Sequence, residues 1–213
     1  MLPYFTDLGI IVTDERPYEL QRHDGTPVHI YDFGLRATEE ASWTRGPEGM
    51  RTAFQEAFEA VWDGLAESDG FNALILSAGL TWRQVVILRT VAKYLRQAGT
   101  TFSQDYIEAT LRGNAHIARL LVELFEARFD PDRFADDAPS AGSAEGSAGD
   151  AGDERVAAEE ACTRVILGAL DDVSSLDEDR ILRSFLSVIR ATLRTNFYQE
   201  GPDGAPTKPT VAL

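Results

Sequence analysis

This sequence of 213 residues is 44% hydrophobic and contains 35 acidic and 20 basic residues, for a formal net charge of −15 at pH 7. The hydrophobic content is ordinary for a globular protein that buries a core. The negative charge opposes nonspecific binding to nucleic-acid phosphates or to an anionic membrane surface. We therefore expect no nucleic-acid partner and no membrane partner.

Three features of the sequence bear on the compartment. The longest aliphatic runs, ALIL at 73–76 and VVIL at 85–88, are far shorter than the about 20 apolar residues that span a bilayer. Met1 is not followed by the basic segment and apolar core of a secretory signal. The single cysteine, Cys162, cannot form an internal disulfide, which is typical of a reducing compartment. We expect a cytoplasmic protein.

Residues 1–67 predict an incomplete α+β module. Residues 1–9 have the pattern of a helix end that Gly9 closes, and the chain is expected to begin in the middle of an element. GIIVTDE (9–15) and VHIYDFG (28–34) are rich in β-branched and aromatic residues and flank a DGTP turn signal, so we expect two or three antiparallel strands. A helix from about Pro47 to Glu67 is expected to cover this sheet through Phe54, Ala57, Phe58, Val61, Trp62 and Leu65.

Residues 68–134 predict a helical module with clear start and stop signals. Thr81 and Gln84 can form a capping box, so one helix is expected from Thr81 to Ala98. Ser103 is expected to open a second helix that closes near Gly113. Asn114 is expected to open a third, which ends at Asp130-Pro131. Its apolar residues recur at the spacing of a buried stripe: Ile117, Leu120, Leu121, Leu124 and Phe125.

The composition changes abruptly at 135–153, an acidic stretch of Ala, Gly and Ser that predicts a flexible linker. A helical hairpin is expected over 154–199. Its first helix runs to Leu170, with Cys162, Val165, Ile166, Ala169 and Leu170 on one face. Its second begins after a capping box at Ser175 and continues to about Phe197, with Ile181, Phe185, Val188, Ile189 and Leu193 inward. Residues 200–213 predict an irregular tail rich in Gly and Pro that breaks off without a closing element.

No pattern in the sequence predicts a catalytic, cofactor-binding or metal site. His23, His29 and His116 are scattered, and no cluster has metal-ligand spacing. Carboxylate pairs such as Glu159-Glu160 are interpreted as solvated faces rather than as general acids or bases. Cys162 is interpreted as a small apolar residue rather than a nucleophile, because no histidine lies near it in sequence.

Two helical stretches are locally basic, 81–98 with Arg83, Arg89, Lys93 and Arg96, and 180–195 with four arginines. We favour faces that meet acidic neighbours within the same fold. The alternative is docking to an acidic surface elsewhere in a larger protein. Three arginines share one stripe at i, i+7 and i+11 and are our candidate docking surface: Arg183, Arg190 and Arg194.

Four stretches together resemble the large bacterial NAD-specific glutamate dehydrogenases. They are LGIIVTDERPYEL (8–20), VHIYDFGLR (28–36), the whole of 70–131, and SSLDEDRILRSFLSVIRATLRTNFYQ (174–199), about half of the chain in the family's order. The resemblance implies that 1–67 is part of an ACT-like regulatory module. It also implies that 200–213 leads to a catalytic domain beginning beyond Leu213, and that the family's glycine fingerprint and catalytic Lys/Asp pair lie in that domain. Lys208 matches no catalytic motif.

The expected fold is therefore mainly α, built of helical hairpins with a small N-terminal antiparallel sheet. The expected function is a noncatalytic regulatory or connector segment, without a cofactor of its own, of an enzyme that uses NAD to convert L-glutamate to 2-oxoglutarate and ammonia. Its expected partners are the remaining domains of that enzyme and other copies in a homo-oligomer. The alternative is a free-standing helical adaptor or effector-sensing module, which the incomplete sheet disfavours. A stop codon directly after Leu213 would favour that alternative.

Overall fold

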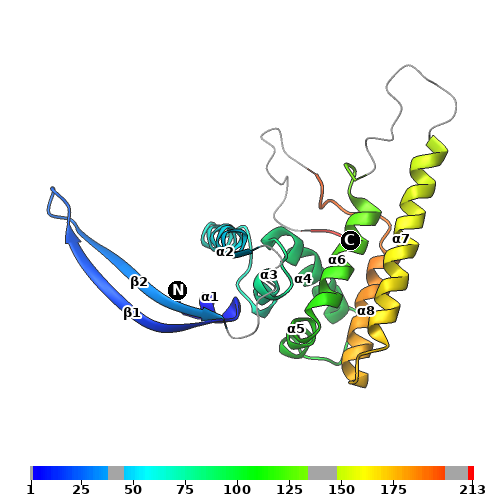
Figure 1. Cartoon of the computed structure of the whole chain (residues 1–213), viewed down its shortest axis with the longest axis horizontal. Helices are drawn as coiled ribbons and strands as arrows, with labels where there is room; N and C mark the ends of the chain where they lie inside the picture. Colours follow the sequence, from blue (N-terminus) through cyan, green and yellow to red (C-terminus); the bar gives the residue numbers. More distant parts are fainter. Residues whose placement is uncertain (1, 38–45, 134–147, 200–210) are drawn as a thin grey trace, which may run out of the picture.

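In the part of the chain that the structure describes, the protein is mainly helical and carries one two-stranded antiparallel sheet, as expected. A computed structural model describes residues 2–37, 46–133, 148–199 and 211–213. In Figure 1 a long hairpin projects from a helical body. The elements in chain order are α1 (Leu2–Asp7), β1 (Ile10–Gln21), β2 (Pro27–Ala37), α2 (Gly46–Trp62), the 3-10 helix η2 (Gly70–Ala73), α3 (Leu74–Ser77), α4 (Trp82–Gln97), α5 (Gln104–Gly113), α6 (Ala115–Phe129), α7 (Ala148–Leu170) and α8 (Leu176–Ala191).

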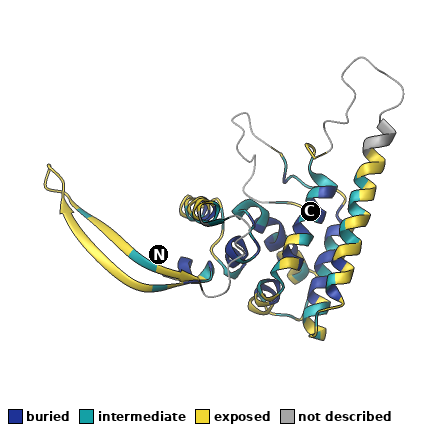
Figure 2. Ribbon diagram, in the orientation of Figure 1, coloured by how far each residue is buried: buried dark blue, intermediate teal, exposed yellow. Residues whose placement is uncertain are grey.

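The hairpin of β1 and β2 confirms the antiparallel pair and the turn between them, but both strands are longer than the predicted 9–15 and 28–34. Tyr18 pairs with Ile30, and the register shifts between Val12 and Asp14, which marks a bulge. The turn uses Gly25 at φ 80°, a conformation that side chains with a Cβ rarely adopt. Most of the hairpin is exposed, as Figure 2 shows, and only its base reaches the core.

The expectation that the helix after the strands covers the sheet is wrong. Phe54 and Phe58 of α2 contact the aromatic rings of α1, and the ring centroids of Phe58 and Tyr4 lie 5.1 Å apart. The same helix also packs on α3 and α4. Trp62 and Leu65, expected to face inward, are 73% and 51% exposed. The helix also stops at Trp62 rather than Glu67, because Gly64 takes a positive φ of 72° and two later N–H groups turn back to the Ala60 carbonyl.

The start signals of the central helices are largely confirmed. Thr81 and Gln84 form the reciprocal capping box at the start of α4, and Ser103 accepts a hydrogen bond from the Tyr106 N–H at the start of α5. Asn114 is an exception. Its side chain does not cap α6 but donates to the Thr110 carbonyl and to Glu178, so it joins α5 to α8.

The boundaries of the last two helices differ from those expected. α7 begins at Ala148, so residues 148–153 are helical rather than linker, and the rest of the predicted linker, 135–147, lies outside the described residues. α8 ends at Ala191 rather than near Phe197. The carbonyl of Thr192 accepts a hydrogen bond of 3.0 Å from Arg128, and the Thr192 backbone is extended, so the helix does not continue.

Two side chains expected on the apolar faces of this hairpin lie outside the core. Val165, within α7, is 55% exposed, and Leu193, beyond the end of α8, is 88% exposed. The two helices still lie side by side as the predicted hairpin (Figure 1).

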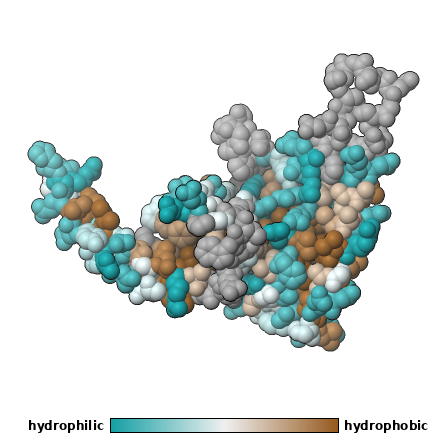
Figure 3. Space-filling view, viewed as in Figure 1, coloured by the Kyte–Doolittle hydropathy of each residue, from teal (hydrophilic) through white to brown (hydrophobic). Residues whose placement is uncertain are grey.

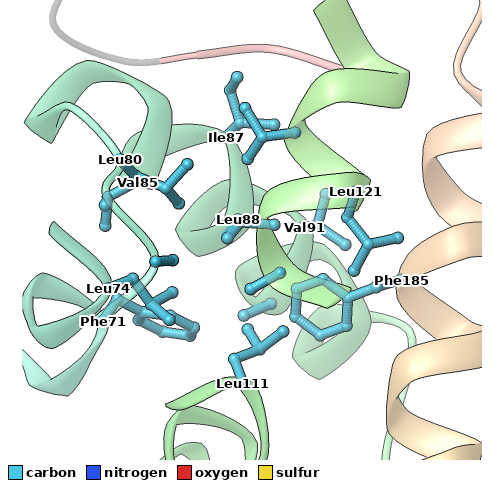
Figure 4. Packing of buried hydrophobic residues seen from close by; sticks show 14 of the residues in the cluster. Phe71, Leu74, Leu80, Val85, Ile87, Leu88, Val91, Leu111, Leu121 and Phe185 are labelled. Carbon is cyan, nitrogen blue, oxygen red and sulfur yellow. The ribbon is translucent and has the colours of Figure 1, made fainter. Parts of the chain in front are cut away.

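One hydrophobic core connects the body. Figure 4 shows side chains from six elements converging: Phe71, Leu74, Leu88, Leu111, Leu121 and Phe185. Leu121 and Leu124 of the predicted α6 stripe are 0% exposed, while Leu120 is only partly buried. The same cluster includes Phe5 of α1, so the core extends from the first helix to α8. The predicted division into 1–67, 68–134 and 154–199 stays a prediction.

Candidate interaction surfaces

The basic residues of α4 make contacts within the fold, and the favoured interpretation of that helix is confirmed in part. Arg89 and Lys93 meet acidic neighbours, whereas Arg83 binds a backbone carbonyl and Arg96 binds the Gln104 side chain. Arg89 is buried and binds Asp69 at 2.7 Å, and it also donates to Asn72 at 2.7 Å. Lys93 pairs with Glu67. Arg83 donates to the Phe197 carbonyl at 2.9 Å and lies 4.6 Å from the centre of the Phe197 ring. These cations stabilise the body rather than present a docking surface.

The arginine stripe predicted on the last helix is not one helical face. Arg183 is held by Asp179 at 2.8 Å and lies 3.9 Å from Asp171, and the hydrogen bond that Arg183 donates to Asp179 raises the pKa of the Arg183 guanidinium. Arg190 lies in the last turn of α8, and Arg194 lies three residues beyond its end. Both are exposed and have no ion-pair partner among the described residues. Arg183 therefore differs from Arg190 and Arg194 in being paired with acidic residues of the same fold.

A groove of about 650 Å³ lies beside Arg194, between α4 and the C-terminal end of α8. Its walls include Tyr94, Val188, Ala191, Leu193 and Leu213. Tyr94 and Leu213 also line a second cavity of about 520 Å³ that reaches Glu67 and Lys93. No sequence pattern predicts this groove, because the spacing of Leu193 from Ile189 is that of a continuing helix.

The outer half of the hairpin is a second exposed apolar surface. Tyr18 and Ile30 are register partners and therefore share a face, and they are 50% and 49% exposed. Leu20 continues the patch at 52%, and brown patches are visible on the hairpin in Figure 3. Neither long edge of the hairpin pairs with another strand within the described residues. Such an edge can accept a further strand.

Glu108 of α5 is a buried carboxylate that no sequence pattern indicates. It accepts a hydrogen bond of 2.8 Å from Gln104 and another from the Gly70 N–H. Burial raises the pKa of the Glu108 carboxyl, the Gln104 hydrogen bond opposes that rise, and the charge of Asp69 adds to it. Only the tertiary approach of Gly70 distinguishes Glu108 from the other acidic residues, so no local pattern could have identified it.

The residues considered for chemistry do not come together. His23 lies in the turn of the hairpin and His29 on β2, whereas His116 opens α6. No group of three or more His, Cys, Asp or Glu suited to a metal ion occurs among the described residues. Burial raises the pKa of the Cys162 thiol, which disfavours the reactive thiolate. None of the described helices combines the length and the apolar character needed to cross a membrane.

Three family models match the chain in succession. Residues 1–46 match the glutamate dehydrogenase ACT3 domain, and residues 66–131 match glutamate dehydrogenase helical motif 3. Residues 165–213 match the catalytic domain of bacterial NAD-glutamate dehydrogenase. The last match starts inside α7, earlier than our expectation that the catalytic domain begins beyond Leu213. A helical body that carries an ACT-type hairpin and these three matches defines a segment of a bacterial glutamate dehydrogenase.

The relatives it matches are NAD-specific. The chain is 42% identical, over 100% of its length, to the NAD-specific glutamate dehydrogenase of Mycobacterium tuberculosis. It is 41% identical, over 96% of its length, to the enzymes of that name from Halomonas elongata and Pseudomonas aeruginosa. It spans 12% of the first relative and 11% of the other two. The chain belongs, as a segment, to the NAD-specific glutamate dehydrogenase family.

Proposed function

We propose that this chain is a noncatalytic connector in a cytoplasmic, homo-oligomeric NAD-dependent glutamate dehydrogenase. Its work is to join an ACT-type regulatory part, represented by the hairpin, to the catalytic part of the same polypeptide. The parent reaction is the oxidation of L-glutamate by NAD to 2-oxoglutarate and ammonia. Its partners are the remaining domains of the enzyme and other copies of the subunit.

The observation that supports this role is the packing between the segments that match different family models. The ring centroid of Phe197 lies 5.6 Å from that of Phe125, and the Arg83 guanidinium lies over the Phe197 ring. Phe197 belongs to the matched segment 165–213, whereas Phe125 and Arg83 belong to 66–131. Arg128 donates to the Thr192 carbonyl across the same boundary. At the other end, Phe5, within 1–46, belongs to the same core as Phe71 and Phe185. A continuous packed core can transmit a displacement between its ends.

The absence of chemistry on this segment is tested with the 213-residue chain alone. Calorimetric titration with NAD and with glutamate is expected to show no saturable binding, and an absorbance assay is expected to show no NADH. The complete polypeptide, assayed in parallel, is expected to form NADH from glutamate and NAD. Saturable NAD binding, or glutamate-dependent NADH formation, by the isolated chain would overturn the noncatalytic assignment.

The connector role is tested in the complete enzyme with Phe197→Ala. This change removes the ring that contacts both Phe125 and Arg83. It is expected to weaken the response to effectors while leaving the reaction itself largely intact. The matched control is Leu176→Ala, at a 65% exposed residue within the same matched segment. An effector response that is equal in both variants would contradict coupling through this contact.

A further inference from the structure

We propose that the groove between α4 and the C-terminal end of α8 is a docking site for an acidic polypeptide segment that inserts a large apolar side chain. The inference rests on the proposed function in one respect, since it takes the docked segment from another part of the complete dehydrogenase polypeptide. It narrows the predicted docking surface to Arg190 and Arg194 and adds an apolar anchor site at Leu193.

The apolar part of this site is exposed in a way that the rest of α8 is not. The helix stops at Ala191, and Leu193 is then 88% exposed, the largest exposed fraction among the exposed large hydrophobic residues described. Tyr94, on α4 across the groove, is 51% exposed. With a volume of about 650 Å³, the groove has room for one or two large side chains. Apolar pockets of this kind receive the anchor residues of polypeptide partners.

The charged part of the site determines which charge a partner must carry. The earlier arginines of α8 are paired within the fold, Arg180 with Asp177 at 3.6 Å and Arg183 with Asp179 at 2.8 Å. Arg190 and Arg194 have no such partner among the described residues, and Arg194 lines the groove itself. Arg194 on the groove wall and Arg190 in the adjoining last turn of α8 are uncompensated cations, and they fit carboxylates that flank an apolar anchor.

The overall charge decides between classes of partner. With a net charge of −15, the chain repels an extended polyanion or an anionic bilayer at long range, and two arginines offset little of that field. A short segment with a few carboxylates needs only local complementarity. A nucleic acid and a membrane are therefore disfavoured, and a polypeptide segment is the occupant that we propose.

The test places a photo-crosslinking amino acid, benzoylphenylalanine, at position 193 of the complete dehydrogenase polypeptide and identifies the linked peptide by mass spectrometry. The expected product joins position 193 to a segment outside residues 1–213 that carries at least two carboxylates next to a large apolar residue. Arg190→Ala with Arg194→Ala is expected to lower the yield about threefold to tenfold, and Arg180→Ala with Arg183→Ala is expected to leave it unchanged. The same probe at Leu176, at the other end of α8, serves as the positional control.

Several outcomes would overturn the proposal. They are no crosslink outside residues 1–213, a crosslink to a segment without carboxylates, and a yield that is insensitive to the loss of Arg190 and Arg194. The crosslink is read by mass, without reference to NADH formation. A polypeptide that crosslinks as expected but does not oxidise glutamate would contradict the proposed function and still support the docking site. An active enzyme that forms no such crosslink would contradict the docking site and still support the proposed function.

Discussion

Arg89 and Asp69 form a bidentate ion pair inside the protein, with Arg89 Nε 2.7 Å from Asp69 Oδ2 and Arg89 Nη2 2.8 Å from Asp69 Oδ1. Their side chains are only 5% and 13% exposed. Asp69 also accepts a hydrogen bond from the Phe71 N–H and so caps η2. One carboxylate therefore holds the start of η2 against the middle of α4.

Asp69→Ala is expected to lower the free energy of unfolding by about 3–5 kcal/mol, because it leaves the Arg89 guanidinium buried without its counter-ion. Urea denaturation followed by circular dichroism measures this loss. The control is Arg180→Ala, which removes an exposed pair at 3.6 Å and is expected to cost less than about 1 kcal/mol. Equal losses from the two variants would mean that the buried pair contributes no more than a surface one.

A second prediction concerns the buried face of α6. Leu121 and Leu124 are 0% exposed, so Leu121→Ala or Leu124→Ala is expected to cost about 2–5 kcal/mol by creating a cavity. Glu123, on the outer side, makes an exposed pair with Arg119 at 3.2 Å. Glu123→Ala is expected to cost less than about 1 kcal/mol. Midpoints in denaturant that shift equally for Leu124→Ala and Glu123→Ala would contradict the orientation of this helix.

The start of α4 and the end of α8 show how far the sequence can be interpreted. The capping box of Thr81 and Gln84 is local, with both residues within one turn, and it forms as predicted. At the end of α8, the extended Thr192 has its carbonyl bound by Arg128, 64 residues away in the sequence. No window of sequence contains both groups. The sequence therefore predicts a helix that continues to about Phe197. It does not predict the groove beside Leu193, which exists because the observed helix ends at Ala191.

The hairpin illustrates the same limit. Its strands and turn follow from local composition, and the register of Tyr18 with Ile30 follows from the turn. The exposure of the hairpin does not follow from local composition, because it depends on where α2 packs. Phe54 and Phe58 could equally have covered a sheet, but they contact the rings of α1 instead. For the candidate site, composition identified the arginines, and only tertiary contacts separated the paired Arg183 from Arg190 and Arg194.

A third prediction compares two glycines that each face a carboxylate. A Cβ at Gly70 would overlap Glu108, and a Cβ at Gly34 would overlap Asp14 and the neighbouring Thr13 hydroxyl. Glu108 is buried and hydrogen-bonded, so Gly70→Ala is expected to cost about 1–3 kcal/mol of unfolding free energy. The Asp14 side chain is 53% exposed and can rotate away, so Gly34→Ala is expected to cost less than about 0.5 kcal/mol.

Combining Gly70→Ala with Glu108→Ala checks the physical reason for this cost. If the overlap with the carboxylate is the cause, the double variant is expected to lose less stability than the sum of the two single variants. Strict additivity in thermal or urea melts would show that Gly70 is required for a reason other than its approach to Glu108.

The last prediction concerns the pH dependence of stability through Glu108. Burial raises the pKa of its carboxyl above the ordinary value of 4.5, so the folded protein keeps this proton to a higher pH than the unfolded chain does. As the pH rises from about 4.5 through the folded-state pKa, the unfolded chain releases the proton first, and the free energy of unfolding falls. The stabilising contribution of this group is therefore fully present below the unfolded-state pKa and is lost at higher pH.

Glu108→Gln has no proton to release at this position, so its unfolding free energy minus that of the wild type is expected to increase from about pH 4.5 upward and then level off. The difference between the two pH profiles is the readout, because the changed hydrogen bonds to Gln104 and Gly70 add only a constant offset. Gln104→Met removes the hydrogen bond that opposes the pKa rise, so it is expected to extend the falling part of the profile to higher pH. Urea titrations between pH 4.5 and 8 measure all three profiles, and a constant difference between wild type and Glu108→Gln would mean that burial does not shift this carboxyl.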